Sequence, residues 1–251
     1  MGFRFGNLVL TPLTLAGAVN AIITAALAEE PSIVVTSNIN HLMLAEKDAA
    51  FRDAVSAARW NLADGWPLVA ASRVFGSPVP ERVAGIDLVA RLLADSRRIR
   101  LAVLGGPPGA AAALADRAAG THDVVLVEPL ERGTWESDDG IMRLQHTLAR
   151  ARPNLVLVGI GPPKQELLAA RLLKSASGPI VCCGAAIEVI AGLRPRAPTV
   201  WQRLGLEWVW RLRLEPARLG PRYAAAALWF ARITTRHALA RRRLVDRRQQ
   251  C

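Results

Sequence analysis

Cysteine and lysine are scarce in this 251-residue chain, which contains three of each. Cys182 and Cys183 are adjacent and Cys251 is the last residue, so neither a disulfide framework nor a spaced set of zinc ligands can be built from them. Small disulfide-rich domains and zinc modules are therefore excluded. A reducing cytoplasm is the expected compartment.

Long uninterrupted apolar runs are also missing. Residues 8–28 carry no charge, but Pro12, Gly17 and Asn20 interrupt them, and we expect a strand, a turn and a helix there instead of a membrane span. The apolar run 223–231 is too short to cross a bilayer. Because 51% of the residues are apolar, the sequence predicts a folded chain with a substantial core.

Acidic residues are outnumbered by basic ones, 21 against 32, and the imbalance lies at one end of the chain. Residues 1–193 carry 18 basic and 18 acidic side chains, whereas residues 194–251 carry 14 arginines and 3 acidic residues, a surplus of 14 − 3 = 11. This distribution predicts a catalytic α/β domain over residues 1–193 and a basic, membrane-associating appendage over residues 194–251.

Short apolar segments bounded by Gly, Pro, Asn or Asp recur along residues 1–193, each followed by an alanine-rich segment of helical length. Strands that are apolar at consecutive positions are buried on both faces. The pattern predicts an α/β fold with a Rossmann-like, mostly parallel sheet flanked by helices. The expected strands are 33–36, 100–104, 124–127, 155–159 and 180–184, and the expected helices are 42–59, 86–96, 110–119, 141–151 and 165–174.

Ligands of open α/β sheets bind beyond the carboxyl ends of the strands, so the loops there are candidate binding sites. Gly105 and Gly106 join a strand to a helix start, where backbone N–H groups can hold a phosphate, although a tight turn is the commoner explanation. Lys164, Gln165 and Glu166 begin another helix and suit a nucleotide or pyrophosphate, while a solvated first turn explains them equally well.

Asp64 follows the short apolar stretch 61–63 and precedes Gly65, at the rim of the expected cleft. A structural turn is the commoner reason for such an aspartate. A lone carboxylate there could also take a proton from a sugar hydroxyl that attacks an activated carbon. No second carboxylate is needed when the leaving group is a nucleotide diphosphate.

Other catalytic classes lack the residues they need. The four histidines are scattered and no serine lies in a GxSxG context, so a hydrolase triad is not expected. Asp138 and Asp139 do not form a DxD motif and are better explained by helix capping. The sequence therefore predicts no divalent-metal site and no cofactor, and Arg82 and Lys164 are candidates to stabilise a departing diphosphate.

The appendage interleaves aromatic residues with arginines, a pattern typical of a helix that lies on a membrane surface. The nucleotide composition of the genome could explain the arginine excess, and nucleic-acid binding could explain the basic patch. The density of tryptophan and leucine favours an anionic membrane over nucleic acid. The aromatic residues are Trp201, Trp208, Trp210, Tyr223 and Trp229.

Taken together, these segments resemble the WecG/TagA/CpsF glycosyltransferases, the family of the N-acetylmannosamine transferases of teichoic-acid linkage-unit synthesis and related surface-polysaccharide enzymes. The similarity runs in order through nearly the whole chain before about residue 232. The residues that carry it are 36–38, 63–65, 81–87, 161–166, 191–192, 196–198, 205–211, 215–216 and 222–223.

The resemblance implies an inverting, metal-independent transfer from a UDP-sugar to a polyprenyl-diphosphate-linked sugar, by a peripheral protein on the inner face of the cell membrane. Asp64 falls on the family's proposed catalytic base. The cleft positions correspond to Thr36, Asn38, Arg82 and Gln165. Arg211 and Arg218 match basic residues that would meet the lipid diphosphate, and Arg222 is expected to share that role.

Two other function classes remain open at this point. A nicotinamide-dependent oxidoreductase would use the Gly105 loop, but it needs an acidic residue about 20 positions further on, and Asp123 and Glu128 fit poorly. A non-catalytic adaptor for lipid or nucleic acid would need only the appendage. The sequence leaves the sugars and the oligomeric state open, a homo-oligomer included.

Overall fold

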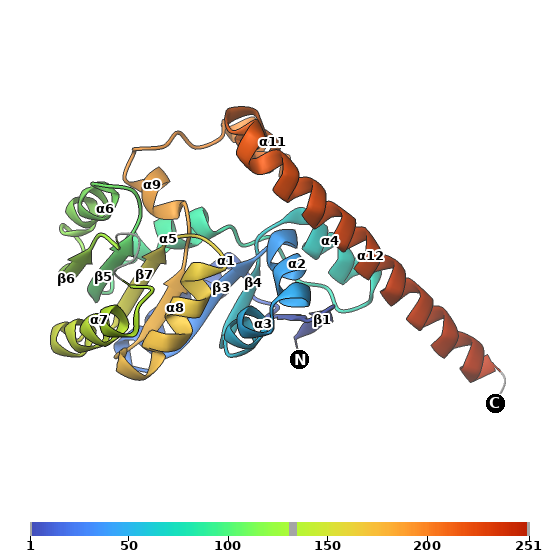
Figure 1. Ribbon diagram of the computed structural model, residues 1–251, viewed down its shortest axis with the longest axis horizontal. Coiled ribbons are helices and arrows are strands. Elements are labelled where there is room, and N and C mark those ends of the chain that lie inside the picture. The colour runs from blue at the N-terminus through green and yellow to red at the C-terminus, as the bar shows by residue number, and fades with distance from the viewer. Residues whose placement is uncertain (1, 131–134, 250–251) are drawn as a thin grey trace.

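The computed structural model describes residues 2–130 and 135–249, which form an α/β fold with a long C-terminal helix (Figure 1). Within these ranges the main sheet has six parallel strands in the order β4-β3-β8-β7-β5-β6. The predicted fold class is confirmed. The strands are β3 (Ser32–Ser37), β4 (Trp60–Ala63), β5 (Arg100–Gly105), β6 (Asp123–Glu128), β7 (Leu155–Gly159) and β8 (Pro179–Cys182).

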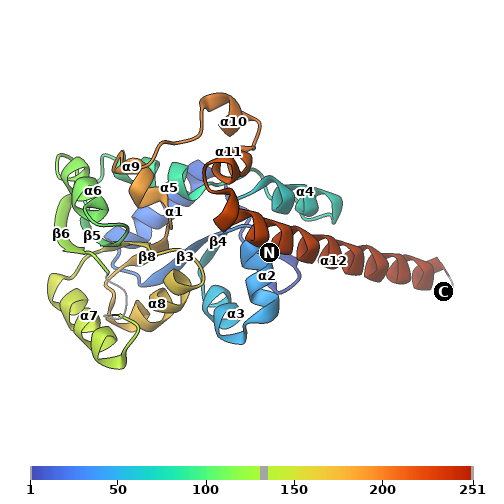
Figure 2. The ribbon, with the colours of Figure 1, turned by 45° about the horizontal axis from the view of Figure 1, so that its top comes forward.

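Helices cover both faces of the sheet (Figure 2). Alternate residues of each central strand enter the two hydrophobic cores, as the consecutive apolar positions predict. One face is covered by α1 (Leu15–Leu27), α5 (Gly85–Leu93), α6 (Ala110–Ala118) and α9 (Ala186–Ile190), and the other by α7 (Asp138–Ala151) and α8 (Lys164–Leu172), which continues into the 3₁₀ turn Leu173–Ser175.

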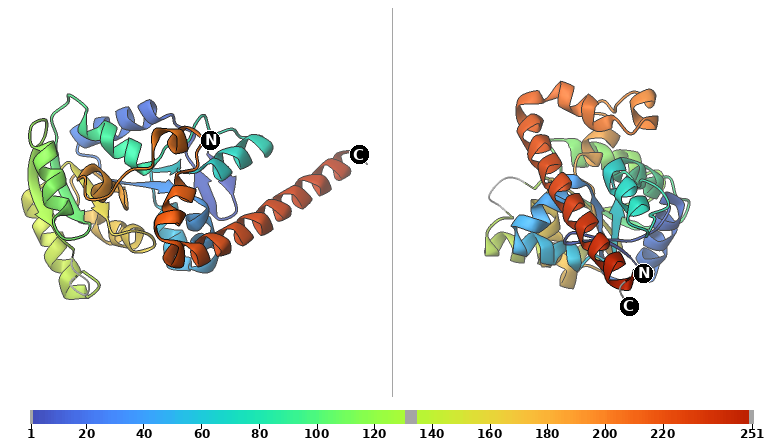
Figure 3. Two further views of the ribbon diagram at one scale, coloured as in Figure 1. Left: turned by 90° about the horizontal axis from the view of Figure 1, so that it is seen from above. Right: turned by 90° about the vertical axis from the view of Figure 1, so that its right-hand side faces the viewer.

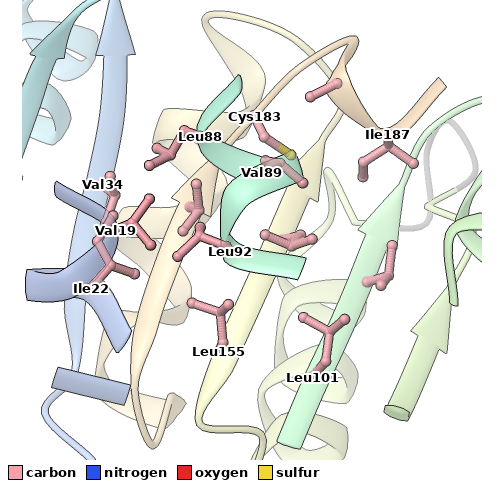
Figure 4. Close-up of a cluster of buried hydrophobic side chains, with 14 of the residues drawn as sticks. Val19, Ile22, Val34, Leu88, Val89, Leu92, Leu101, Leu155, Cys183 and Ile187 are labelled. Atoms are coloured by element: carbon pink, nitrogen blue, oxygen red, sulfur yellow. The ribbon is translucent and has the colours of Figure 1, made fainter. Parts of the chain in front are cut away.

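Helix α5 lies at the centre of the first core. Its side chains Leu88, Val89 and Leu92 lie between α1 and the strand residues Leu101 and Leu155 (Figure 4). All five are fully buried. Because the sheet is apolar on both faces, polar groups that serve a ligand can gather only at the strand ends.

The prediction of a single helix over residues 42–59 is wrong. Two helices occupy this region, α2 (Ile39–Lys47) and α3 (Ala49–Ser56). Asp48 separates them with an extended backbone (φ −123°), and its side chain accepts a hydrogen bond from the Phe51 N–H at 3.1 Å. An aspartate that caps a following helix in this way ends the preceding one.

Strand β6 departs from the prediction that every strand is buried on both faces. It lies at the edge of the sheet, and its residues are half-buried or exposed. A helix cap also differs from the prediction. Ser137 caps α7 by accepting a hydrogen bond from the Gly140 N–H at 3.1 Å, and both Asp138 and Asp139 lie in the first turn.

The part of the fold around β3 and β4 contains elements that the sequence predicted and others that it did not. The predicted strand and helix of residues 8–28 are confirmed as β2 (Leu8–Leu10) and α1, and β2 pairs in antiparallel fashion with β1 (Phe3–Phe5). The stretch after residue 60 is the edge strand β4, and α4 (Trp66–Val74) follows it. This arrangement puts Asp64 in a strand-to-helix loop.

The C-terminal segment forms α10 (Thr199–Arg203), α11 (Glu207–Leu214) and α12 (Pro216–Gln249). Helix α12 packs against α2 and the β1–β2 hairpin and then extends beyond the rest of the fold (Figure 3). Ile233 is buried there, the Phe230 ring lies 5.6 Å from the Phe5 ring, and the Gly6 N–H donates to His237 Nε2 at 3.0 Å. Within the described residues no helix is both long and apolar enough to span a bilayer.

Leu92→Ala is expected to lower the free energy of unfolding by about 2–5 kcal/mol, because it leaves a cavity between α5 and the sheet. Urea denaturation measures the loss. Met142→Ala on α7, where the side chain is 57% exposed, serves as the control and should change stability by less than about 0.5 kcal/mol. Equal losses for the two variants would contradict the assigned core.

Candidate functional site

The loops that follow β3 and β4 meet at the carboxyl edge of the sheet. The Asp64 N–H donates to the Ser37 carbonyl at 2.7 Å, which holds the two loops together. Gly65 has a positive φ of 151°, and a Cβ on it would lie 3.7 Å from the Cβ of Asn38. Asp64 and Asn38, predicted separately from the sequence, are therefore neighbours.

The Asp64 carboxylate sits in a strongly charged environment and is only 29% exposed. Burial raises its pKa, whereas Arg82, whose Nη1 lies 4.0 Å from Oδ1, and Arg211 lower the pKa. Glu207 raises it again. The net direction is upward, which suits a carboxylate that must accept a proton.

Arg82 joins this carboxylate to the C-terminal segment. Its Nη1 donates to Glu207 Oε2 at 2.9 Å, and its Nη2 lies 4.0 Å from Asp87 Oδ2. Arg196 continues the network, because its Nη2 donates to Asp87 Oδ1 at 2.6 Å and its Nε lies 3.5 Å from Glu207 Oε1. Two arginines and three carboxylates therefore connect the loop after β4, the start of α5 and the start of α11.

Gln165 and Glu166 are almost completely buried, 3% and 0% exposed, and are engaged inside the protein. Gln165 Oε1 accepts hydrogen bonds from the Gly161 N–H at 3.2 Å and the Gly184 N–H at 2.9 Å. The Glu166 Oε1 atom accepts from Gln165 Nε2 at 2.7 Å and lies 3.2 Å from His41 Nε2. These contacts fasten the loops after β7 and β8 to helix α2.

Thr36 is the penultimate residue of β3 and lies beside the first residue of α5. Its side chain is 7% exposed, and a Cβ on Gly85 would lie 3.0 Å from the Thr36 Oγ1 atom. Any side chain at residue 85 would press on this hydroxyl. The glycine therefore allows α5 to begin against the strand end.

Gly105 and Gly106 both have positive φ angles, 84° and 90°. The Gly106 N–H donates to the Gly159 carbonyl at 2.9 Å, and a Cβ on Gly105 would lie 2.5 Å from the Ile160 side chain. These contacts explain the glycines as a tight turn packed on the end of β7. Phosphate binding at this loop stays a prediction.

Three predicted basic residues lie apart from Asp64. Lys164 donates to Glu136 Oε1 at 2.8 Å and lines an open groove of about 650 Å³ between α3, α7 and α8. Arg218 is exposed and pairs with Glu215, and Arg222 is exposed beside the Tyr223 ring. Of the three C-terminal arginines predicted to bind ligand, Arg211 is the one whose charge is among the main influences on the pKa of Asp64.

His41, Asp87, Arg196 and Glu207 are site residues that the sequence analysis does not single out. Asp87, Arg196 and Glu207 lie within segments that carry the family resemblance, so those segments contained the available signal. His41 lies three residues after Asn38, and periodicity gave no reason to separate it from a core histidine. In the described part of the chain, no group of three or more His, Cys, Asp and Glu side chains could hold a metal ion.

Two comparisons with known proteins bear on this site. Residues 3–244 match the model of the glycosyl transferase WecG/TagA/CpsF family. A curated relative from Bacillus spizizenii (strain ATCC 23059 / NRRL B-14472 / W23) is 28% identical over 207 residues, which cover 78% of this chain and 79% of that protein. That relative is named N-acetylglucosaminyldiphosphoundecaprenol N-acetyl-beta-D-mannosaminyltransferase.

Opposite shifts in the Asp64 pKa are expected from two substitutions in the ion network. Arg82→Gln removes the largest opposing charge and should raise the pKa, whereas Glu207→Gln removes a neighbouring negative charge and should lower it. Titration of the Asp64 carboxyl by ¹³C NMR, assigned with Asp64→Asn, measures both. Glu29→Gln is the control, because Glu29 precedes β3 at the opposite end of the sheet. Shifts of the same sign in the Arg82 and Glu207 variants would contradict the network.

Proposed function

The chain belongs to the WecG/TagA/CpsF family of glycosyltransferases, and we propose that it moves a sugar from a UDP-sugar to a polyprenyl-diphosphate-linked sugar. The donor sugar is N-acetylmannosamine or a related hexose or uronic acid, and the product serves bacterial surface-polysaccharide synthesis. The name of the Bacillus spizizenii relative supports this substrate class. Membership of this family removes the two alternatives left open by the sequence, a nicotinamide-dependent oxidoreductase and a non-catalytic adaptor.

The observation that carries the proposed chemistry is the position of Asp64. It is a partly buried carboxylate with an upward pKa shift, at a strand end beside Asn38 and Arg82. In the transfer, Asp64 accepts the proton of the acceptor hydroxyl while that oxygen attacks C1 of the donor sugar. The C1–O bond breaks, the electron pair leaves with UDP, and the configuration at C1 inverts.

Cationic side chains would stabilise the departing diphosphate without a metal ion. Arg82 is the best placed of these, because it lies 4.0 Å from Asp64 and is only 15% exposed. Lys164, Gly105 and Gly106 would contribute if the donor extends towards β5 and α8. Thr36, Asn38 and Gln165 lie around the same strand ends and would bind or shape the sugar site.

The C-terminal segment would bring the acceptor to this site. Arg211 approaches Asp64, whereas Arg218 and Arg222 lie on the first turns of α12 and would meet the lipid diphosphate. Trp208, which is 50% exposed, and Leu228, which is 72% exposed, add apolar surface on the same segment. Arginines and exposed apolar side chains on one helical segment suit peripheral attachment to the anionic inner face of the cell membrane.

Asp64→Asn should lower turnover about 100-fold or more while UDP-sugar binding survives, because the amide keeps the shape of the side chain and removes its basicity. Transfer is measured as lipid product by mass spectrometry, with a set of UDP-sugars, a polyprenyl-diphosphate-linked acceptor and EDTA. Calorimetry measures donor binding.

The control for this experiment is Asp95→Asn, which alters an aspartate in the loop between α5 and β5, on the amino-terminal side of the sheet. It should leave turnover near that of the unsubstituted protein. Unchanged turnover of Asp64→Asn would remove the base assignment. Activity that is lost in EDTA and restored by Mg²⁺ would remove the metal-independent mechanism.

Reversing three exposed charges of α12 should weaken binding to anionic vesicles by about 3 kcal/mol, roughly 100-fold, since each basic residue near such a surface contributes about 1 kcal/mol. The variant is Arg222→Glu, Arg232→Glu and Arg236→Glu, all at exposed positions of α12. Vesicle flotation with and without salt measures the binding.

A matched variant changes the net charge by the same amount, but on helices of the α/β domain. Arg91→Glu, Arg143→Glu and Arg150→Glu alter exposed arginines of α5 and α7, and this protein should float like the unsubstituted one. If both variants lose binding equally, net charge and not α12 drives attachment. If the unsubstituted protein does not float, the membrane proposal fails and nucleic acid becomes the partner to test.

A further inference from the structure

We propose that His41 and Glu166 are positioning residues of the transfer site: they form a buried pair that holds the Asn38 side chain beside Asp64, with its amide N–H groups free to donate to a substrate oxygen. The inference rests on the proposed function, because it assigns Asn38 to substrate recognition. It adds two residues that act through others and do not touch the substrate.

The orientation of the Asn38 amide follows from its backbone neighbour. Asn38 caps α2, and its Oδ1 atom accepts a hydrogen bond from the Asn40 N–H at 3.0 Å. A backbone N–H requires an acceptor, so the oxygen faces α2 and the Nδ2 atom faces away. Within residues 2–130 and 135–249, Nδ2 has no hydrogen-bond partner, and Gly65 lies against the Asn38 Cβ. A donor group is therefore available beside Asp64.

His41 contacts the same asparagine. Its side chain is 4% exposed, and its Nδ1 atom lies 3.2 Å from Asn38 Oδ1. The Nδ1 atom also accepts a hydrogen bond from the Asn38 backbone N–H at 3.4 Å, which closes a capping box at the start of α2. The His41 ring therefore contacts both the side chain and the backbone of Asn38. The ring also packs against Phe51, with 5.8 Å between the ring centroids.

Glu166 fixes the other end of the ring. The Glu166 Oε1 atom lies 3.2 Å from His41 Nε2 and is fully buried. The same oxygen accepts from Gln165 Nε2, and Gln165 Oε1 holds the N–H groups of Gly161 and Gly184. One hydrogen-bonded series therefore runs from Asn38 through His41, Glu166 and Gln165 to the loops after β7 and β8.

This series has an electrostatic consequence for the base. A buried carboxylate is costly without a partner, so Glu166 keeps the His41 ring in place. A positive charge on the His41 ring would lower the pKa of Asp64, but burial, Arg82, Arg211 and Glu207 have larger effects on that pKa. The pair thus acts mainly on geometry, and its loss should affect substrate binding more than proton transfer.

His41→Phe should raise the donor KM about 10-fold or more and change kcat by less than about 3-fold, because the ring packing survives while the support of Asn38 is lost. Glu166→Leu should have the same effect. Glu166→Gln keeps a polar head group of the same shape and should stay within about 3-fold of the unsubstituted protein. His146→Phe, at an exposed position of α7, is the matched control.

A second measurement needs no variant to fold. In ¹⁵N-histidine NMR spectra of the unsubstituted protein, assigned with His41→Gln, the Nε2 atom of His41 should carry a slowly exchanging proton, because it lies 3.2 Å from the buried Glu166 Oε1 atom. An unprotonated Nε2, or an unchanged donor KM in both His41→Phe and Glu166→Leu, would overturn the positioning role. Absence of transfer by the unsubstituted protein with every donor would instead defeat the proposed function, and the NMR measurement would still decide the orientation of the pair.

Discussion

The arrangement of the site depends on the ion pairs of the Arg82 guanidinium. It is 15% exposed, and a cation removed from water is tolerated only when carboxylates compensate it. Asp64, Asp87 and Glu207 do so from three different segments. Because Glu207 begins α11, the C-terminal segment must be seated before Arg82 is fully compensated. The site is therefore shared between the sheet and the segment that carries the basic surplus.

The fold was largely predictable because it depends on burial, which leaves a direct trace in the sequence. Strands buried on both faces are apolar at consecutive positions, and the central strands were found from that pattern alone. The division of residues 42–59 was missed because Asp48 acts through one side-chain hydrogen bond, which no periodicity reveals. Edge strands and short hairpins bury less surface and leave weaker traces.

The strand-end residues of the site could be predicted from the sequence, whereas the side-chain contacts between distant residues could not. Asp64 and Asn38 follow apolar stretches, so their place at the sheet edge could be inferred. The Arg82–Glu207 contact joins residues 125 positions apart, and the His41–Glu166 contact spans the same separation. Spacing cannot pair such residues, since their proximity depends on how the helices pack. The structure supplied these pairs.

Helix α12 ends up against the first strands of the chain, where the Gly6 N–H meets His237 across 231 positions of sequence. Contacts of such long range form late, since loop closure must precede them. During synthesis, the Phe5 ring lacks its packing partners Phe230 and His237 until these residues have left the ribosome. An interrupted translation product would consequently expose an aromatic surface, a feature by which chaperones and proteases distinguish unfinished chains from complete ones.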